Sequence, residues 1–240
     1  MLGHRGGRGE GWPAENSLAA FARALDEGAD GVELDVRLTS DAVPIVFHDP
    51  TLARATGGRD TRAVQRVAYA DLPELEGGER IPRLVEALAA LRESIVNVEI
   101  KADVTPASLL GELPDRLRLV RAAAAAVKRA PGADVVFSSF DPLVVVALAA
   151  VAPRVPRAIL VGMNTPRAAT ALPIAMRAAA SAAHLEHRLY TRLRAERLAR
   201  SGLRLAAWTV NDPERAVALV ALGVAWIITD APGAIVRALR

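Results

Sequence analysis

The sequence predicts an α/β fold, a TIM (β/α)8 barrel with a β-hairpin extension after the second strand and a short insertion over the barrel mouth. Three observations indicate this fold. The chain has 240 residues, close to the roughly 250 residues of a single barrel of this kind. Apolar, β-rich runs alternate with Ala-, Leu- and Arg-rich runs of helical character. The runs of strand character outnumber the eight of a barrel by one, and two of them are too close together to hold a helix between them.

The two close segments, 31–37 and 44–48, are interpreted as a β-hairpin whose turn lies near Asp41-Ala42. With these two residues as the loop, His48 lies directly opposite Asp35. Setting the returning arm aside leaves eight β/α repeats, the count of the barrel. A doubly wound open sheet is the alternative, but the βα turns lack the G-x-G-x-x-G pattern of a dinucleotide site. The expected strands cover 2–4, 31–37, 44–48, 95–101, 134–139, 157–161, 182–186, 203–210 and 225–229.

Helices are expected between most of these strands, and several carry start signals. Ser17 suits the N-cap of the first, and Asp-Pro opens two others, at 141–142 and 212–213. Glycines stand where three of the helices should end. The expected helices cover 17–28, 82–93, 115–130, 142–152, 166–180, 191–201, 213–222 and 232–239.

Residues 1–240 are interpreted as a single barrel domain with a small insertion at about 49–80. This segment is the one long connection without clear periodicity, and it contains the pairs Gly57-Gly58 and Gly77-Gly78. A connection of this length in a compact domain is typical of a lid or a small subdomain. A surface excursion without a role is the alternative.

Composition excludes several classes of protein. The chain has no Cys, which rules out a disulfide scaffold, a zinc ribbon and thiol catalysis. Nearly all of its 30 basic residues are Arg, scattered among 27 acids, and the net charge is only +3. With 4% aromatic residues, this pattern disfavours a nucleic-acid partner. We expect a cytoplasmic protein without stable membrane insertion, because no signal peptide or membrane span is visible. The oligomeric state is not indicated.

Three acidic residues fall near the carboxyl ends of two neighbouring strands, where barrels of this kind carry their active sites. Glu33 and Asp35 are two residues apart, so both side chains point to one face of their strand, and Glu99 ends the next barrel strand. Three carboxylates in a partly buried mouth do not all stay ionised without a cation. Oxygen ligands without Cys favour Mg²⁺ or Ca²⁺ over zinc. Pairing of the acids with basic side chains alone is the alternative.

Two of the four histidines, His4 and His48, fall at the same mouth and suggest a general acid and base near neutral pH. Arg5 and Lys101 add positive charge beside the acids. A guanidinium, an ammonium and a divalent cation together suit a phosphate group. His184 and Glu186 share a face of their strand and could also line the mouth.

Short segments of this chain resemble the motifs of a known family, in the same order and over nearly its whole length. The matching motifs resemble those of the glycerophosphodiester phosphodiesterases, a family of TIM-barrel enzymes. They are HRG at 4–6, ENS at 15–17, GADGVELDV at 28–36, TSDAVPIVFHDPTLARATGG at 39–58, NVEIK at 97–101, SSFDP at 138–142, AWTVND at 207–212 and GVAWIITDAP at 223–232.

The resemblance implies that the segment at 49–80 is an insertion over the barrel mouth. It also implies a role for several single residues. The implied roles are ligands of Ca²⁺ or Mg²⁺ for Glu33, Asp35 and Glu99; the acid/base pair for His4 and His48; phosphate contacts for Arg5 and Lys101; and the border of the substrate pocket for Trp208 and Phe140.

The chain also departs from the family pattern at a few positions. The first βα loop has one residue more than the usual P-E-N-T motif, in Pro13-Ala14-Glu15-Asn16-Ser17. The hairpin turn ends in Ala42 where Gly is usual, so the turn is strained, or of another type, if this position needs a positive φ. Ala225-Trp226 replaces the usual residues at the start of the last strand. These differences concern the substrate preference and remove none of the implied catalytic residues.

The implied activity is that of a phosphoric diester hydrolase of lipid and glycerol metabolism, which converts a glycerophosphodiester to glycerol 3-phosphate and an alcohol. We expect His4 as the base and His48 as the acid, although the sequence does not orient the substrate and the reverse assignment stays open. The nucleophile is water or the glycerol 2-hydroxyl. The alternatives are a lysophospholipase D-like or cyclising phosphodiesterase on the same scaffold, or a catalytically silent barrel that binds a phosphate ligand. The head group and the choice of metal are not determined.

Overall fold

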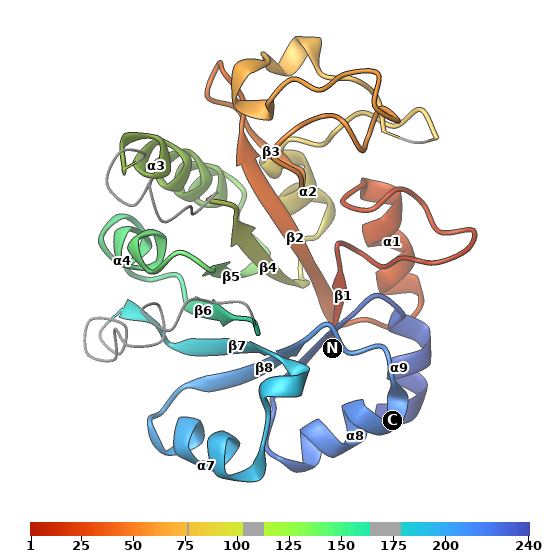
Figure 1. The fold of residues 1–240 in the computed structure, drawn as a ribbon, viewed down its shortest axis with the longest axis vertical. Helices are drawn as coiled ribbons and strands as arrows, with labels where there is room; N and C mark the ends of the chain where they lie inside the picture. Colours follow the sequence, from red (N-terminus) through yellow and green to blue (C-terminus); the bar gives the residue numbers. More distant parts are fainter. Residues whose placement is uncertain (76, 103–112, 164–178) are drawn as a thin grey trace.

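A closed barrel of parallel strands forms the centre of the computed structural model, which describes residues 1–75, 77–102, 113–163 and 179–240 (Figure 1). Within these residues the order is β1-β9-β8-β7-β6-β5-β4-β2, and parallel pairing of β1 with β2 closes the circle. β3 runs antiparallel to β2 as the expected hairpin arm. The predicted fold is thus confirmed. The strands are β1 Leu2–His4, β2 Gly31–Leu38, β3 Pro44–Val46, β4 Ile95–Ile100, β5 Asp134–Ser139, β6 Arg157–Val161, β7 Ala182–Glu186, β8 Arg204–Trp208 and β9 Trp226–Thr229.

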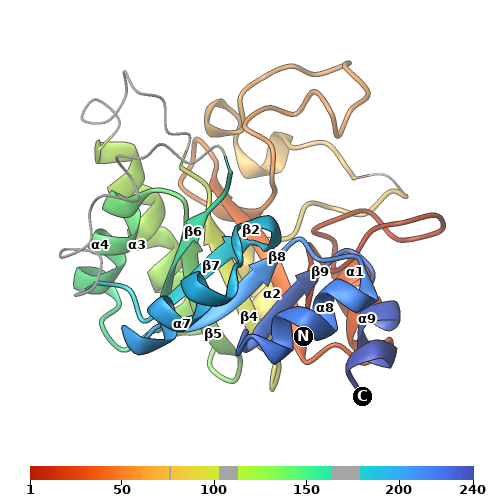
Figure 2. The ribbon, with the colours of Figure 1, turned by 60° about the horizontal axis from the view of Figure 1, so that its bottom comes forward.

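Helices cover the outside of the barrel (Figure 2), and the predicted start signals act as caps. The side chains of Ser17, Asp141 and Asp212 accept hydrogen bonds from backbone N–H groups in the first turns of α1, α4 and α8. The helix expected over 166–180 lies almost entirely outside the described residues. Among the helices that are described, none has the length and apolar character to cross a membrane. The helices are α1 Leu18–Asp26, α2 Leu84–Ala90, α3 Leu113–Arg129, α4 Pro142–Val151, α7 Arg192–Arg200, α8 Pro213–Ala221 and α9 Pro232–Leu239.

Alternation along the strands separates the packed exterior of the barrel from its interior. On β4, Val96, Val98 and Ile100 belong to the core cluster shared with the surrounding helices. The residues between them, Asn97 and Glu99, therefore point into the barrel. The same alternation holds on the other strands, so every second side chain faces the interior or the mouth.

The β2–β3 hairpin has a different register from the one expected. Val36 pairs with Val46, and the backbone N–H of Phe47 donates to the carbonyl of Asp35 at 2.9 Å. Phe47, and not His48, is therefore opposite Asp35, so the expected register was wrong. The physical reason is a loop of three residues, 40–42, which Ala42 ends in the left-handed region with φ of 62°. His48 follows β3 as a loop residue.

The segment at 49–80 packs on the hairpin arm and occupies the top of Figure 1. It contains two short 3₁₀ turns, η1 Val64–Arg66 and η2 Tyr69–Asp71. Isolated bridges join Thr51 to Ala63 and Glu74 to Arg80. The segment shares a small apolar core with the hairpin, made of Ile45, Phe47, Leu52, Val64, Val67, Leu75 and Ile81.

The barrel interior contains polar side chains that are cut off from solvent. Asn97, Ser138 and His184 are at most 1% exposed, and their side-chain nitrogen and oxygen atoms have no hydrogen-bond partner among the described residues. His184 packs beside the ring of Trp226 at a centroid distance of 6.0 Å. It is therefore a residue of the barrel interior and not of the mouth. Burial lowers the pKa of His184 to about 3.

We predict that Ala42→Gly stabilises the protein by about 0.5–1 kcal/mol, because a left-handed backbone strains alanine and not glycine. The rise in melting temperature should be about 1–4 °C for a domain of this size. Ala218→Gly is the matched control, since Ala218 is exposed within α8, where glycine should destabilise by about 0.5–1 kcal/mol. Loss of stability in both variants would contradict a strained turn.

We predict that His184 makes the fold sensitive to acid. Below pH 6.5 the unfolded chain binds a proton at this residue, whereas the folded chain does not until about pH 3, so stability falls as pH falls. Between pH 7 and pH 5 the loss from this group should be about 2 kcal/mol. Urea unfolding at the two pH values measures it. His184→Leu should remove that loss, and His187→Gln, at a more exposed histidine, should keep most of it. An equal pH dependence in wild type and His184→Leu would refute this assignment.

Candidate active site

Three carboxylates meet at the mouth end of β2 and β4. In the parallel register Asp35 lies beside Glu99. Glu33 lies two residues before Asp35 on the same face of β2 and is therefore deeper in the barrel. One carboxylate oxygen from each residue lies within 4.8 Å of the other two. All three side chains are buried, with 8% exposure at most. The structure therefore brings together the three acids that the sequence singled out.

The pKa values of these three acids are shifted in different directions. Burial raises the pKa of Glu33 well above its usual range, and the nearby charges of Asp35 and Glu99 raise it further. Burial also raises the pKa of Glu99, against the opposing effect of Lys101. Burial alone would raise the pKa of Asp35, but the charges of Lys101 and Arg5 hold it well below its usual range. Arg5 and Lys101 therefore stabilise the charge of Asp35 but not fully those of Glu33 and Glu99.

A divalent cation fits this donor set. Buried oxygens of Glu33 (Oε1) and Asp35 (Oδ1) have no hydrogen-bond partner among the described residues, and oxygen-rich sites of this kind suit Mg²⁺ or Ca²⁺. A cation between the three acids would lower their pKa values and relieve their mutual repulsion. The acid cluster is therefore a candidate metal centre.

Asn16 holds Asp35 in place. Its Nδ2 donates to Oδ2 of Asp35 at 2.9 Å, and its Oδ1 accepts from the backbone N–H of Asp35 at 3.3 Å. The backbone N–H of Asn16 in turn donates to the carbonyl of Arg5 at 2.9 Å. Asn16 has a φ of 63°, a conformation that asparagine tolerates better than most residues. The first βα loop is thereby tied to the acid cluster.

Two basic side chains border the acids. Nε of Arg5 lies 3.1 Å from Oδ2 of Asp35, and Nη1 donates to Glu15 at 2.9 Å. Nζ of Lys101 donates to Oε1 of Glu99 at 2.8 Å and lies 3.3 Å from Oδ1 of Asp35. Burial lowers the pKa of Lys101, but the charges of Glu99 and Asp35 outweigh it and raise the pKa overall. Both groups are therefore cationic at neutral pH.

The two histidines have the same local arrangement. Nδ1 of His4 lies 2.7 Å from Oδ1 of Asp230, and Nδ1 of His48 lies 2.8 Å from Oδ1 of Asp49. A carboxylate at Nδ1 holds a proton on that nitrogen and leaves Nε2 for chemistry. Nε2 of His4 lies 3.8 Å from Oε2 of Glu33. Burial lowers the pKa of His48, and Lys101 and Arg5 lower it further against the opposing charge of Asp35.

Sequence reasoning gave no role to the partners of these residues. Asp230 and Asn16 enter the sequence analysis only as members of matching motifs, at 223–232 and 15–17. Asp230 also binds the guanidinium of Arg8 at 3.0 Å and accepts from Asn211 at 2.9 Å. Its position directly after β9 was a usable signal, because acids at strand ends collect at the mouth.

Two aromatic side chains border the mouth away from the acids. The rings of Phe140 and Trp208 are perpendicular, with centroids 5.4 Å apart. Phe140 follows β5 and Trp208 ends β8, so their contact spans β6 and β7. Nε1 of Trp208 donates to the carbonyl of His184 at 3.0 Å, which fixes the indole ring. The pair gives this side of the mouth an apolar edge.

Comparisons with known proteins agree on one family. The model of the glycerophosphoryl diester phosphodiesterase family matches residues 4–234. A glycerophosphodiester phosphodiesterase of Caldanaerobacter subterraneus subsp. tengcongensis is 30% identical over 94% of this chain and 92% of its own. The structure of an Oleispira antarctica phosphodiesterase in complex with the product sn-glycerol-3-phosphate has a TM-score of 0.84 at 25% identity, covering 99% of this chain and 95% of that chain. The lysophospholipase D GDPD1 of Rattus norvegicus is 36% identical over 42% of this chain and 36% of its own.

We predict that Glu33→Gln separates metal binding from folding. The pKa of Glu33 is raised, so a neutral amide should leave the melting temperature of the metal-free protein unchanged or higher. The rise in melting temperature that Mg²⁺ or Ca²⁺ gives to the EDTA-treated wild type should be lost.

The matched control is Glu15→Gln, at an acid that pairs with Arg5 and Arg54 outside the metal trio. Its metal-free melting temperature should fall, because the pKa of Glu15 is lowered by those partners despite its burial, and its response to the cation should persist. A full cation response in Glu33→Gln would exclude this residue as a ligand.

Proposed function

The chain belongs to the glycerophosphoryl diester phosphodiesterase family, and we propose that it hydrolyses glycerophosphodiesters to glycerol 3-phosphate and an alcohol by metal-dependent acid/base catalysis. It is a phosphoric diester hydrolase. The observation that carries the proposal is the meeting of three buried acids with two cations and two histidines at one mouth. The product bound by the Oleispira antarctica phosphodiesterase supports glycerol 3-phosphate as the product of this chain.

Glu33, Asp35 and Glu99 would hold Mg²⁺ or Ca²⁺. The bound cation would supply charge stabilisation at a phosphoryl oxygen of the diester. Arg5 and Lys101 bind the same phosphate from their positions beside Asp35. The guanidinium of Arg5 is oriented by Glu15, so its geometry is preorganised before substrate arrives.

His4 and His48 move the protons. Nε2 of His4 accepts the proton of the attacking hydroxyl, which belongs to water or to the glycerol 2-hydroxyl. Nε2 of His48 donates a proton to the oxygen of the departing alcohol. Asp230 and Asp49 hold the two rings in the required orientation and stabilise each ring when it is protonated. A product with a cyclic phosphate would identify the 2-hydroxyl as the nucleophile.

A lysophospholipase D-like activity is the second candidate. The apolar edge formed by Phe140 and Trp208 could contact an acyl chain, and part of the chain is similar to a lysophospholipase D. The two activities share the same centre and differ in what lies beyond the glycerol. Cleavage of a lysophospholipid, measured beside glycerophosphocholine, separates them.

We predict that His4→Ala and His48→Ala each lower kcat for release of glycerol 3-phosphate by about 10²–10⁴-fold with Mg²⁺ or Ca²⁺ present, because each removes a proton-transfer group. A coupled assay for glycerol 3-phosphate measures the rate. EDTA should abolish activity in the wild type, and either cation should restore it.

His187→Ala is the matched control, since His187 lies outside the acid cluster in η3 His187–Leu189 and should keep wild-type activity. Full activity in His4→Ala or His48→Ala would exclude that histidine from proton transfer.

A further inference from the structure

The carboxylate that orients His48 is itself held by an arginine. Oδ1 of Asp49 binds Nδ1 of His48 at 2.8 Å, and Oδ2 of the same carboxylate accepts a hydrogen bond from Nε of Arg54 at 2.5 Å. Both oxygens of Asp49 are engaged, so rotation of the carboxylate would break one of the two contacts. Because charge-assisted bonds from a guanidinium are among the strong hydrogen bonds of proteins, Arg54 fixes the plane in which Asp49 meets the ring.

The same arrangement recurs at His4. Asp230 binds Nδ1 of His4 with Oδ1, and the guanidinium of Arg8 donates to both oxygens of this carboxylate, from Nε and Nη2 at 3.0 Å each. Two parallel bonds from one guanidinium add geometric specificity to their strength. Asn211 also donates to Oδ2 of Asp230, at 2.9 Å. Each of the two histidines is thus followed by an aspartate and then by an arginine.

The carboxylate of Glu15 joins the two arrangements. Its Oε1 accepts from Nη2 of Arg54 at 2.5 Å, and its Oε2 accepts from Nη1 of Arg8 at 3.5 Å. Burial would raise the pKa of Glu15, but Arg54 and Arg5 hold the pKa below its usual value, so the carboxylate is ionised at neutral pH. The contacts from one histidine to the other form a continuous series, the histidine network, made of His4, Asp230, Arg8, Glu15, Arg54, Asp49 and His48.

The histidine network joins parts of the mouth that are far apart in the sequence. Asp230 directly follows β9, and Arg8 and Glu15 lie in the loop between β1 and α1. Arg54 belongs to the 49–80 segment, 39 positions beyond Glu15. These contacts therefore set the first βα loop and the 49–80 segment in a fixed relation to each other and to the end of β9.

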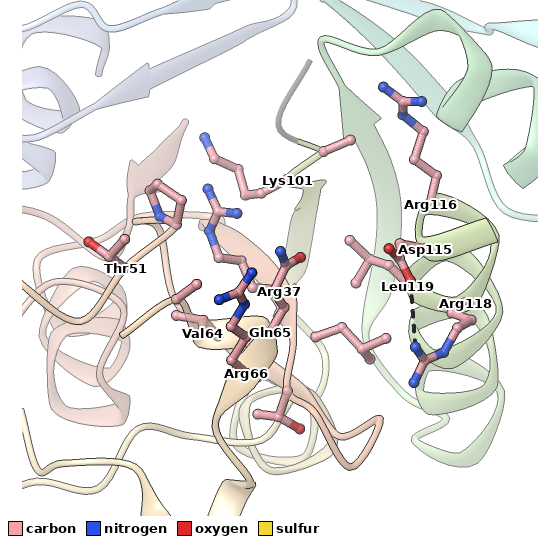
Figure 3. A pocket seen from close by; sticks show the side chains of 15 residues that line it. Arg37, Thr51, Val64, Gln65, Arg66, Lys101, Asp115, Arg116, Arg118 and Leu119 are labelled. Carbon is pink, nitrogen blue, oxygen red and sulfur yellow. Dashed lines mark ion pairs between the residues drawn. The ribbon is translucent and has the colours of Figure 1, made fainter. Parts of the chain in front are cut away.

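The 49–80 segment has a cavity on each side. One of about 520 Å³ lies between the segment and α3, and Figure 3 shows Thr51 of the segment and Leu119 of α3 on its opposite walls. The other, of about 500 Å³, lies between the segment and the first βα loop, and Arg54 and Glu15 are in its lining. Side chains do not fill these spaces, so packing alone does not fix the segment there. The ion pair of Arg54 with Glu15 supplies a direct contact beside the second cavity.

We propose that Arg54 and Arg8, joined by Glu15, are positioning residues that act through the aspartates orienting the two histidines. The inference rests on the proposed function, because that function gives the two rings their proton transfers. Without Arg54 the carboxylate of Asp49 is free to turn, and the ring of His48 spends less time in the orientation that its proton transfer needs. Binding of the phosphate depends on other side chains and stays intact.

The first test measures kcat and KM of Arg54→Gln with Mg²⁺ or Ca²⁺ present. The substrate is the one that the wild type cleaves fastest among glycerophosphocholine, glycerophosphoethanolamine and glycerophosphoglycerol. kcat should fall about tenfold, the usual cost of removing a group that holds a functional side chain in place. KM should stay within about twofold of the wild type, because no contact to the phosphate is removed.

The matched control is Arg62→Gln. Arg62 lies in the same segment as Arg54, pairs with Asp60 at 2.7 Å and has a side chain that is 54% exposed, against 58% for Arg54. Its ion pair lies outside the histidine network, so the control should keep the wild-type kcat. A wild-type kcat in Arg54→Gln as well would overturn the proposal.

A double-mutant cycle separates positioning from a general structural effect. If Arg54 acts through His48, adding Arg54→Gln to His48→Ala should change kcat by less than about twofold, because the ring it positions is already gone. In the His4→Ala protein the full loss from Arg54→Gln should remain. Losses that multiply in the His48→Ala protein overturn the role of Arg54. The same cycle with Arg8→Gln and His4→Ala tests the other arm of the network.

The tautomer of His48 gives a readout that needs no turnover. NMR of the ring nitrogens at about pH 8, where a histidine of ordinary or lowered pKa is neutral, shows whether the proton is on Nδ1 or Nε2, and His48→Ala identifies the signals. In the wild type Asp49 should hold the proton on Nδ1. Arg54→Gln should give a mixture of the two tautomers, and Arg62→Gln should not.

Failure of the positioning role and failure of the proposed function give different results. In an active enzyme the double-mutant cycle decides, and a wild-type kcat in Arg54→Gln leaves the proposed function standing while the positioning role falls. If the wild type cleaves none of the diesters, the proposed function falls, and the tautomer of His48 decides the role of Arg54. The exposed side chain of Arg54 indicates that the variant will fold, which its melting temperature checks. If it does not fold, Arg54→Lys replaces it, because lysine keeps the charge without the planar fork of N–H donors.

Discussion

The ionised carboxylate of Asp35 is the contact on which the site depends. It is 1% exposed and still bears charge, because Arg5, Lys101 and Asn16 surround it. Each of these three residues comes from a different part of the barrel, so one buried charge ties β1, β4 and the first βα loop together. An unpaired charge at this depth would be strongly destabilising. The arrangement therefore stabilises the mouth while keeping carboxylate oxygens available for a cation.

The polar side chains of β2 lie in one row, because alternate residues of a strand point to the same face. The inward face of β2 carries Glu33, then Asp35, then Arg37, each two residues beyond the last. The strand thus carries a buried guanidinium two residues beyond the second acid of the cluster. His48 lies beside this row because the hairpin folds back onto β2, and the bond from Arg37 to its carbonyl fixes it there. The acid cluster and one of the two mouth histidines consequently share one structural support.

Periodicity and strand-end position were sufficient to predict the barrel and the meeting of Glu33, Asp35 and Glu99. They depend on repeating backbone geometry, which the order of residue types reveals. The predicted hairpin register was wrong because the loop has three residues and not two, which shifts the pairing by one residue. The sequence does not reveal this, because alanine at position 42 gives no sign of the positive φ that it adopts. Asn16 was missed because its contacts depend on how the first βα loop closes over the mouth, which local sequence does not encode. Asp230 was missed although its position directly after β9 was a usable signal.

The apolar core shared by the 49–80 segment and the hairpin arm makes these two parts one mechanical unit. Ile45 and Phe47 belong both to the hairpin arm and to the core of the segment, and His48 follows them directly. Exchange of this segment with that of a relative would thus also move His48, the proposed proton donor, unless Ile45 and Phe47 are exchanged together with it. The graftable module for redesigning specificity in this barrel therefore begins before the hairpin arm, at the loop containing Ala42, and ends beyond Ile81.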